Sequence, residues 1–223
     1  MPYKPGQTER SMDVFADNPD PRCPVVLLLD KSASMNGQPI EQLNADLKAF
    51  QQEVTKDALV ARRAEIAVIS FGPVTTDVEF DTADRFVPPN LKPEGDTPMG
   101  RAINVALDML GRRKQTYKDN GIAYYRPLVF LITDGAPTDD WAMAARRVRE
   151  EEEAKRVAFF TVGVDGADFN TLAQIGVREP IRLRGLRFSE LFQWLSASLA
   201  AVSRSQPGTS IALPPTPRGW SEI

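Results

Sequence analysis

The sequence predicts an α/β protein with a doubly wound, Rossmann-like sheet that is mostly parallel and carries helices on both faces. Two segments, roughly residues 24–30 and 127–133, have the continuous apolar character of strands buried on both faces. The first segment ends in Asp30 and the second is followed by Asp134, and the rest of the chain alternates between helical and strand patterns. We therefore expect a central sheet of about six strands, with one antiparallel strand at an edge.

A long helix should follow the first strand. An Asn36-Gly37 turn leads to Pro39, which suits the first residue of a helix. Apolar residues then recur at steps of three and four to about Lys56, which marks one buried helix face. These residues are Ile40, Leu43, Leu47, Phe50 and Val54.

A hairpin should come next. Residues 65–71 and 74–80 have strand character and are separated by Gly72-Pro73. This connection is too short for a parallel crossover, so we expect an antiparallel pair. Residues 81–95 are rich in proline and predict a loop across the top of the sheet.

The second half should continue the alternation of helices and strands. One helix face is marked by Met99, Ala102, Ile103, Ala106 and Leu110. After the strand over 127–133 we expect a charged helix (about 139–155), a strand (157–164), a short helix (about 168–174) and a short strand (181–183). A final helix has a buried stripe formed by Phe188, Leu191, Phe192, Leu195, Leu199 and Val202.

These elements form one predicted domain over residues 23–204. A polar N-terminal segment, residues 1–22, precedes it, and a tail rich in proline, serine and glycine, residues 205–223, follows it. The tail segment 213–220 has two interpretations. It is either a free end or a segment that docks in an extended conformation through Trp220.

Composition excludes several classes of protein. The 223 residues carry 27 basic and 30 acidic side chains, a net charge of −3, which gives no electrostatic footprint for nucleic acid. No apolar run is long enough to span a membrane, and the N-terminus lacks the apolar core of a signal peptide. A single cysteine, Cys23, cannot form an internal disulfide. We expect a cytoplasmic monomer.

The chain contains no histidine. Its absence excludes Ser-His-Asp and Cys-His nucleophile pairs, histidine zinc sites and any imidazole base. Carboxylates or lysines could still transfer protons. Most hydrolase chemistries are nevertheless excluded, so a binding module becomes the favoured class.

Oxygen-bearing side chains follow both apolar strands. Asp30, Ser32 and Ser34 come at the end of the first strand, and Asp134 follows the second. Thr97 precedes Pro98 at a predicted helix start, where we expect it to be the N-cap. Ligands of open parallel sheets bind beyond the carboxyl ends of the strands. Carboxylate and hydroxyl oxygens suit hard cations, so the pattern predicts a site for Mg²⁺, with Mn²⁺ or Ca²⁺ as alternatives.

The Asp-x-Ser-x-Ser motif at 30–34, the Thr-Pro-Met-Gly motif at 97–100 and the Thr-Asp-Gly motif at 133–135 together resemble the metal-ion-dependent adhesion site of von Willebrand factor type A domains. The resemblance covers about residues 22–204. It implies that Ser32 and Ser34 bind the metal directly, and that Thr97, Asp30 and Asp134 bind it directly or through water. It also implies a non-enzymatic module in which an Asp or Glu of a protein partner completes the coordination.

A finer resemblance concerns residues 22–30 and 131–141, which look like TerY-type tellurite-resistance proteins of bacteria. Those proteins are cytoplasmic and are often encoded beside a PP2C-type phosphatase and a protein kinase. The resemblance therefore implies a scaffold or regulator in a stress or phosphorylation-signalling assembly, with such enzymes as partners.

Four residues are predicted to form the partner-binding rim of the site: Lys31, Asp96, Asp139 and Trp141. Lys31 and Asp96 replace small residues that are frequent in the family. Asp139 should help to open a helix, and Trp141 either packs beneath that turn or borders the binding face.

Two other functions remain open. The same fold serves as the metal-site subunit of chelatase or AAA+ (MoxR-like) assemblies. A Mg²⁺-dependent phosphatase or phosphotransfer protein could instead use Asp30 as nucleophile. However, the haloacid-dehalogenase type needs a second aspartate two residues on, where this chain has Ser32.

Overall fold

The computed structural model describes residue 15 and residues 17–217. Within these residues a six-stranded sheet has the strand order β3-β2-β1-β4-β5-β6. The strands are β1 (Cys23–Asp30), β2 (Ala64–Phe71), β3 (Thr75–Thr82), β4 (Leu128–Thr133), β5 (Ala158–Gly163) and β6 (Ile181–Arg182). All neighbouring pairs are parallel except β2 and β3, which are antiparallel. The predicted fold class, including the antiparallel edge strand, is confirmed.

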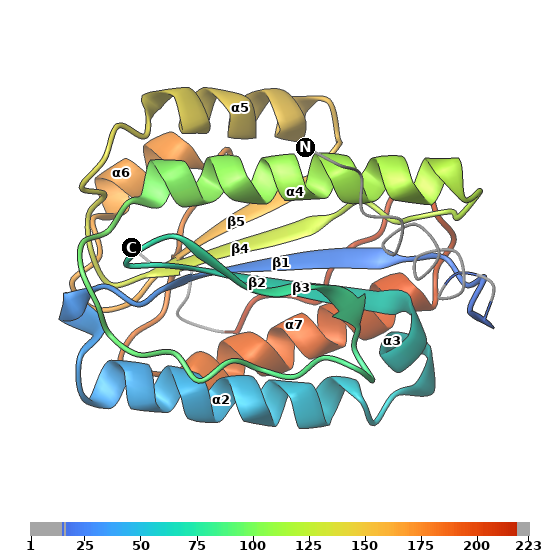
Figure 1. The fold of residues 1–223 in the computed structure, drawn as a ribbon, viewed down its shortest axis with the longest axis horizontal. Coiled ribbons are helices and arrows are strands. Elements are labelled where there is room, and N and C mark those ends of the chain that lie inside the picture. Colours follow the sequence, from blue (N-terminus) through green and yellow to red (C-terminus); the bar gives the residue numbers. More distant parts are fainter. Residues whose placement is uncertain (1–14, 16, 218–223) are drawn as a thin grey trace, which may run out of the picture.

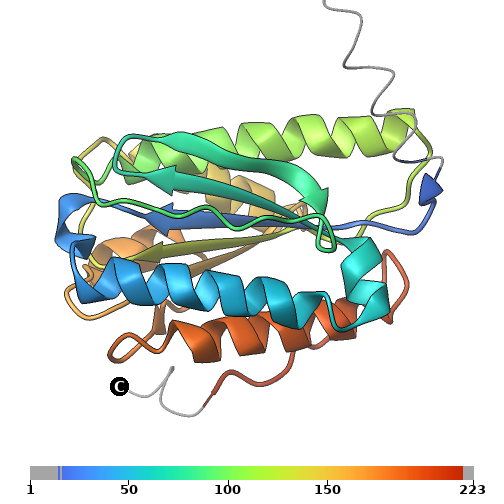
Figure 2. The same ribbon diagram turned by 60° about the horizontal axis from the view of Figure 1, so that its bottom comes forward.

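The helices form a layer on each face of the sheet (Figure 1). One layer contains α2 (Gln38–Val54), α3 (Ala58–Arg63) and α7 (Phe188–Ser203), with α2 and α7 side by side (Figure 2). The opposite layer contains α4 (Met99–Asp119), α5 (Ala142–Glu153) and α6 (Phe169–Ile175). A short 3₁₀ turn, η1 (Ala33–Met35), follows β1.

The central strand β1 is buried along its whole length. Its side chains alternate between the two layers, as a pleated strand requires. Val25, Leu27 and Leu29 pack with α2 and α7, whereas Val26 and Leu28 pack with α4 and α5. A strand that is apolar on both faces explains why no hydrophobic alternation is visible in the sequence of this segment.

Strand order reverses at β1, which pairs with β2 on one side and with β4 on the other. In open α/β sheets the connections leave a crevice at such a point, outside the carboxyl ends of the strands. Asp30 is the last residue of β1, and Asp134 directly follows β4. The topology therefore brings both aspartates to this crevice.

Several element boundaries differ from the predictions. Helix α3 was not expected, because its six residues are too few to show a period. It is fixed locally by Asp57, whose carboxylate accepts hydrogen bonds from the N–H groups of Leu59 and Val60. Pro39 is the second residue of α2 and not the first. Helix α4 runs to Asp119, beyond the apolar stripe that predicted it.

The C-terminal tail contacts its own domain. The indole Nε1 of Trp194 donates a 2.9 Å hydrogen bond to the carbonyl oxygen of Pro214, and Ile211 and Leu213 pack against the core under α7. Trp220 lies outside the described residues, as do residues 1–14 of the N-terminal segment. No helix in the described ranges has the length and apolar character needed to cross a bilayer.

Candidate functional site

Asp30 is the innermost residue of the candidate site. It has no solvent-exposed surface. The backbone N–H of Ser32 donates a 2.8 Å hydrogen bond to Oδ1 of Asp30, and the Thr133 hydroxyl donates to Oδ2. Both carboxylate oxygens therefore have hydrogen-bond donors that fix the orientation of the side chain. One donor comes from the loop after β1, and the other comes from the last residue of β4.

Ser32 and Ser34 connect this loop to the end of β4. The two Oγ atoms lie 2.9 Å apart, and Ser34 Oγ donates a 2.8 Å hydrogen bond to Oδ1 of Asp134. Ser32 directly precedes the 3₁₀ turn η1, and Ser34 lies within it. The result is a continuous hydrogen-bonded path from Ser32 to Asp134, across the point where strand order reverses.

Thr97 approaches from a third segment, the loop before α4. Thr97 and Thr138 are held together by two hydrogen bonds. The N–H of Thr97 donates to Thr138 Oγ1 at 3.0 Å, and the N–H of Thr138 donates to the carbonyl oxygen of Thr97 at 2.9 Å. A Cβ atom at Gly135 would lie 3.8 Å from Thr97 Oγ1, which places this hydroxyl beside the end of β4. The hydroxyl has no hydrogen-bond partner among the described residues.

Two glycines allow this loop to come so close, and the sequence analysis did not identify them as part of the site. A Cβ atom at Gly72 would lie 2.4 Å from the carbonyl oxygen of Glu94, a clash with rigid backbone. Gly95 has a φ of +67°, which favours glycine, and its carbonyl oxygen accepts a 3.0 Å hydrogen bond from the N–H of Ala33. In the sequence, the turn-forming pairs Gly72-Pro73 and Gly95-Asp96 could have indicated that these two glycines shape the loop beside the site.

The electrostatics of the site are those of two carboxylates without a counter-charge. Burial raises the pKa of Asp30, and the negative charge of Asp134 raises it further, while the hydrogen bonds from Ser32 and Thr133 lower it. Neither aspartate forms an ion pair with a basic side chain among residues 17–217. The arrangement therefore has a preorganised but uncompensated negative charge.

The predicted metal ligands Asp30, Ser32, Ser34, Thr97 and Asp134 thus come together at one end of the sheet. They offer two carboxylates and three hydroxyls, an all-oxygen set that fits a hard divalent cation. No group of three or more His, Cys, Asp or Glu side chains suited to a metal occurs in the described part of the chain. A cation bound here would depend on the hydroxyl groups.

The four predicted rim residues are placed differently from one another. Lys31 is half-buried, and its backbone pairs with Phe71 and Glu94. Asp96 is exposed. Trp141 is half-buried and packs against the core under α4 and α5, which favours the packing interpretation. Asp139 accepts hydrogen bonds from two backbone N–H groups at the start of α4.

The helix starts near the site correct two expectations. Thr97 is not the N-cap of α4, because the cap position is Pro98 and the helix begins at Met99. The N–H groups of Gly100 and Arg101, which have no acceptor within the helix, instead donate to the Asp139 carboxylate at 2.9 and 2.8 Å. Asp139 therefore caps α4 and does not open the helix that follows, which begins at Ala142. Its carboxylate complements the positive end of the α4 dipole.

Comparisons with known proteins agree with this geometry. The sequence model of the von Willebrand factor type A domain matches residues 25–182. No curated protein sequence matches the chain.

Solved structures with the same fold include three examples from different sources. Proximal thread matrix protein 1 from the mussel byssus has 21% identity and a TM-score of 0.55, over 81% of this chain and 48% of its own. The pilus adhesin SpaC of Lactobacillus rhamnosus GG has 12% identity and a TM-score of 0.66, over 82% of this chain and 30% of its own. The vWF domain of the pilus tip protein Mfa5 of Porphyromonas gingivalis has 11% identity and a TM-score of 0.60, over 85% and 99%. The chain thus spans about half the length, or less, of the first two.

Proposed function

Because this chain belongs to the von Willebrand factor type A family, we propose that it is a binding module that recognises a carboxylate of a protein partner through a divalent metal ion. The observation that carries the proposal is the hydrogen-bonded path from Ser32 through Ser34 to Asp134, beside the buried Asp30. A structural neighbour, the Plasmodium vivax TRAP protein, has been solved loaded with manganese, at 16% identity and a TM-score of 0.52. That neighbour supports the choice of a divalent cation.

Each residue has a definite task in this proposal. Ser32 and Ser34 provide hydroxyl ligands, and Thr97 provides a third hydroxyl, directly or through water. Asp30 and Asp134 supply the negative charge, directly or through water, and also hold the serines by hydrogen bonds. A metal bound here would supply the positive charge that attracts the partner's carboxylate.

Mg²⁺ is the ion that we propose, with Mn²⁺ and Ca²⁺ as alternatives. Mg²⁺ prefers octahedral oxygen coordination and retains several waters, so it is suited to a site with few charged ligands. Ca²⁺ takes six to eight oxygen ligands, typically with more carboxylate character than two aspartates provide. A small ligand set also leaves a coordination position for the partner.

We propose that the protein is not an enzyme. The carboxylate of Asp30 has no exposed surface and both of its oxygens accept hydrogen bonds, which is a poor arrangement for a nucleophile. Burial raises the pKa of the Cys23 thiol to about 12, so this side chain is not a thiolate nucleophile either. Hydrolysis of a generic phosphomonoester that Asp30→Asn abolishes would contradict this assignment.

The biological setting that we propose is that of a cytoplasmic TerY-type protein, with a PP2C-type phosphatase or a protein kinase as partner. It rests on the resemblance of residues 22–30 and 131–141 alone. The chelatase or AAA+ alternative predicts a different partner, an ATPase.

Partner capture tests the proposed function. The immobilised protein should retain a partner from extract of its source in Mg²⁺ and release it in EDTA, and Ser34→Ala should retain little. Thr116→Ala removes a hydroxyl near the C-terminal end of α4, far from the site, and serves as the matched control. Identification of the released protein separates a phosphatase or kinase from an ATPase. Equal capture in Mg²⁺ and EDTA would contradict a metal-dependent mechanism.

A further inference from the structure

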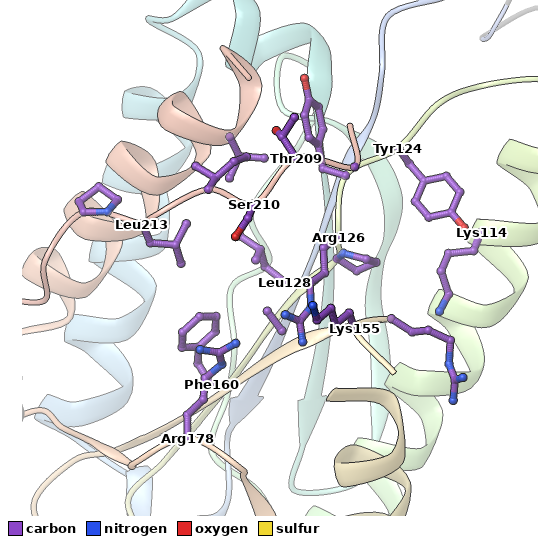
Figure 3. Close-up of a pocket in the computed structure, with 18 of the residues that line it drawn as sticks. Lys114, Tyr124, Arg126, Leu128, Lys155, Phe160, Arg178, Thr209, Ser210 and Leu213 are labelled. Atoms are coloured by element: carbon purple, nitrogen blue, oxygen red, sulfur yellow. The ribbon is translucent and has the colours of Figure 1, made fainter. Parts of the chain in front are cut away.

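A second concave site lies at the opposite end of the sheet, around the amino ends of β4 and β5 (Figure 3). The cavity has a volume of about 810 Å³. Its walls come from the ends of α4 and α5, from α7 and from the C-terminal tail. None of the predicted metal ligands lines it.

The cavity exists because the sheet is incomplete at this edge. Strand β6 has two residues and pairs only with Val162 and Gly163 of β5. No strand among the described residues pairs with the outer edge of β5 before that point. Tail residues 208–216 pass over this region and form one wall of the cavity. A tail is a looser cover than a strand, so space remains between it and the sheet.

The lining of this cavity is strongly basic. Among the described lining residues no side chain is acidic, and the basic ones are Lys114, Lys118, Arg126, Lys155, Arg156 and Arg178.

Two glutamates behind the wall neutralise part of this charge. Glu152 pairs with Arg126 and Arg178. Glu151 pairs with Lys114 and Arg156. Lys118 and Lys155 have no ion-pair partner among residues 17–217. The cavity therefore has an excess of positive charge.

The interior of the cavity is apolar. Its apolar lining residues include Leu128, Phe160, Trp194, Val202, Ile211 and Leu213. One face of Phe160 stacks on Phe130, with ring centroids 4.8 Å apart, and Arg178 lies 5.0 Å from the ring centroid. The other aromatic lining residues are also packed within the protein: Tyr124 lies against Tyr117, Trp194 lies edge-on to Phe160, and Tyr125 is buried. The half-buried Ile211 and Leu213 add an aliphatic wall. This arrangement suits an aliphatic chain better than a stacked nucleobase.

The backbone conformation of Lys155 also supports a functional role for the cavity. Its φ of +55° lies in the left-handed region, and it is the only non-glycine residue with positive φ among the described residues. It follows the last turn of α5, where glycine is the usual residue. Residues held in such conformations concentrate at functional sites. Figure 3 shows Lys155 beside Arg126 in the cavity wall.

We propose that this cavity binds an amphiphilic organic anion, with a carboxylate or phosphate head group on an aliphatic body. The volume falls within the range of about 300–1,000 Å³ found for small-molecule sites. The head group lies at Lys118 and Lys155, which have no other charge partner, and the body lies along Leu128 and Leu213. The proposal does not depend on the metal site.

Displacement of a fluorescent anion tests this proposal in the full chain. Anilinonaphthalene sulfonate combines a negative charge with an apolar body, and its emission should rise and saturate at one site per chain. Decanoate or decyl phosphate should displace it, and the stronger of the two identifies the head group. Decyltrimethylammonium has the same chain with a positive charge and should not displace it. Equal displacement by the cation would overturn the proposal, as would the absence of saturable binding.

Charge variants locate the binding. Lys118→Gln combined with Lys155→Asn should weaken displacement by the better anion about tenfold or more, because two unpaired cations are removed. Asparagine tolerates positive φ, so the α5 terminus should survive. Lys48→Gln combined with Lys92→Gln removes the same charge from exposed positions elsewhere and should change nothing.

A second pair of variants works from the opposite wall. Ser210 is exposed and lines the cavity on the tail side. Ser210→Glu adds a negative charge and should weaken the binding of the anion, whereas Ser210→Gln, of similar size, should leave the binding unchanged. Unchanged affinity in both the lysine double variant and Ser210→Glu, with folding intact, would overturn the proposed site.

Discussion

The two ends of the parallel sheet carry opposite charge and are built in different ways. At the carboxyl end, Asp30 and Asp134 lie together without a basic partner, held by hydroxyl and backbone donors. At the amino end, basic residues surround a cavity and exceed the two glutamates behind them. Helix N-termini lie at the first end and helix C-termini at the second, so each set of charges complements the adjacent helix dipoles. One fold thus offers a cation site and an anion site that are separated by the core.

The largest effect on stability should come from replacing Glu152, which is buried at the amino end of the sheet. Its carboxylate pairs with Arg126 and Arg178 and accepts a 2.6 Å hydrogen bond from the N–H of Phe159. Glu152→Ala should lower the free energy of unfolding by about 2–4 kcal/mol, because it leaves the buried N–H of Phe159 without an acceptor and removes the partner of two partly exposed arginines. Urea unfolding measures this. Glu150→Ala, on an exposed face of α5, should cost well under about 1 kcal/mol. Similar losses for both would contradict the structural role of Glu152.

The next effect should separate the functions of the two ends. Ser32→Ala combined with Ser34→Ala should weaken Mg²⁺ binding by about 100-fold or more, because it removes two proposed ligands and the link to Asp134. Displacement of anilinonaphthalene sulfonate by decanoate should be unchanged. Calorimetry and fluorescence measure the two affinities. A parallel loss of both would mean that the ends are coupled or that the fold has failed.

A smaller effect concerns the cost of the uncompensated carboxylates. In metal-free protein at about pH 7, Asp30→Asn should unfold at the same or a higher temperature than the wild type. Asparagine can accept the hydrogen bond from the Ser32 N–H through its oxygen and donate its amide N–H to Thr133 Oγ1, which reverses the second bond, and it removes the charge that Asp134 repels.

The pH dependence has a definite sign. Burial raises the pKa of Asp30 in the folded state, so the folded protein binds this proton more tightly than the unfolded chain does. Wild-type stability is therefore lost as pH rises from the ordinary aspartate pKa through the raised one. The advantage of Asp30→Asn should grow over that window and be absent below it. Asp84→Asn, an exposed control, should show no such trend.

The smallest effect should appear at Lys155. Lys155→Gly should raise the free energy of unfolding by about 0.5–1 kcal/mol, because glycine adopts a φ of +55° without strain. The same change at Lys118, inside the last turn of α4, should cost about 1 kcal/mol. Both variants should weaken the binding of the anion. Destabilisation by Lys155→Gly would show that the lysine side chain makes a contact that outweighs the strain.

The two ends also differ in how far they can be predicted from sequence. The site at the carboxyl end could be predicted because the first strand ends at a recognisable aspartate, and Asp30, Ser32 and Ser34 lie within five residues of the chain. Parallel strands bring such ends together without any detailed packing. What sequence could not supply was the cap of α4, because Asp139 is far along the chain from Gly100 and Arg101.

The cavity at the amino end of the sheet could not be predicted from the sequence, for a physical reason. Its residues range from Lys114 to Thr216 and come from helix ends, strands, connecting segments and the tail, so no local motif groups them in the sequence. The cavity depends on the length of β6, which was predicted as residues 181–183 but has only two residues in the structure. It also depends on where the tail lies, and a tail rich in proline carries no periodic signal. The small net charge of −3 does not reveal that negative charge gathers at one end of the sheet and positive charge at the other.

The most direct test of the proposed function is a calorimetric titration of Mg²⁺, and then Mn²⁺, into protein stripped with a chelator. The account predicts one binding site per chain in the wild type and in Asp84→Ala, and loss of that binding in Asp30→Ala. Absence of binding by the wild type, or equal binding by Asp30→Ala, would contradict a metal site at the carboxyl end of the sheet.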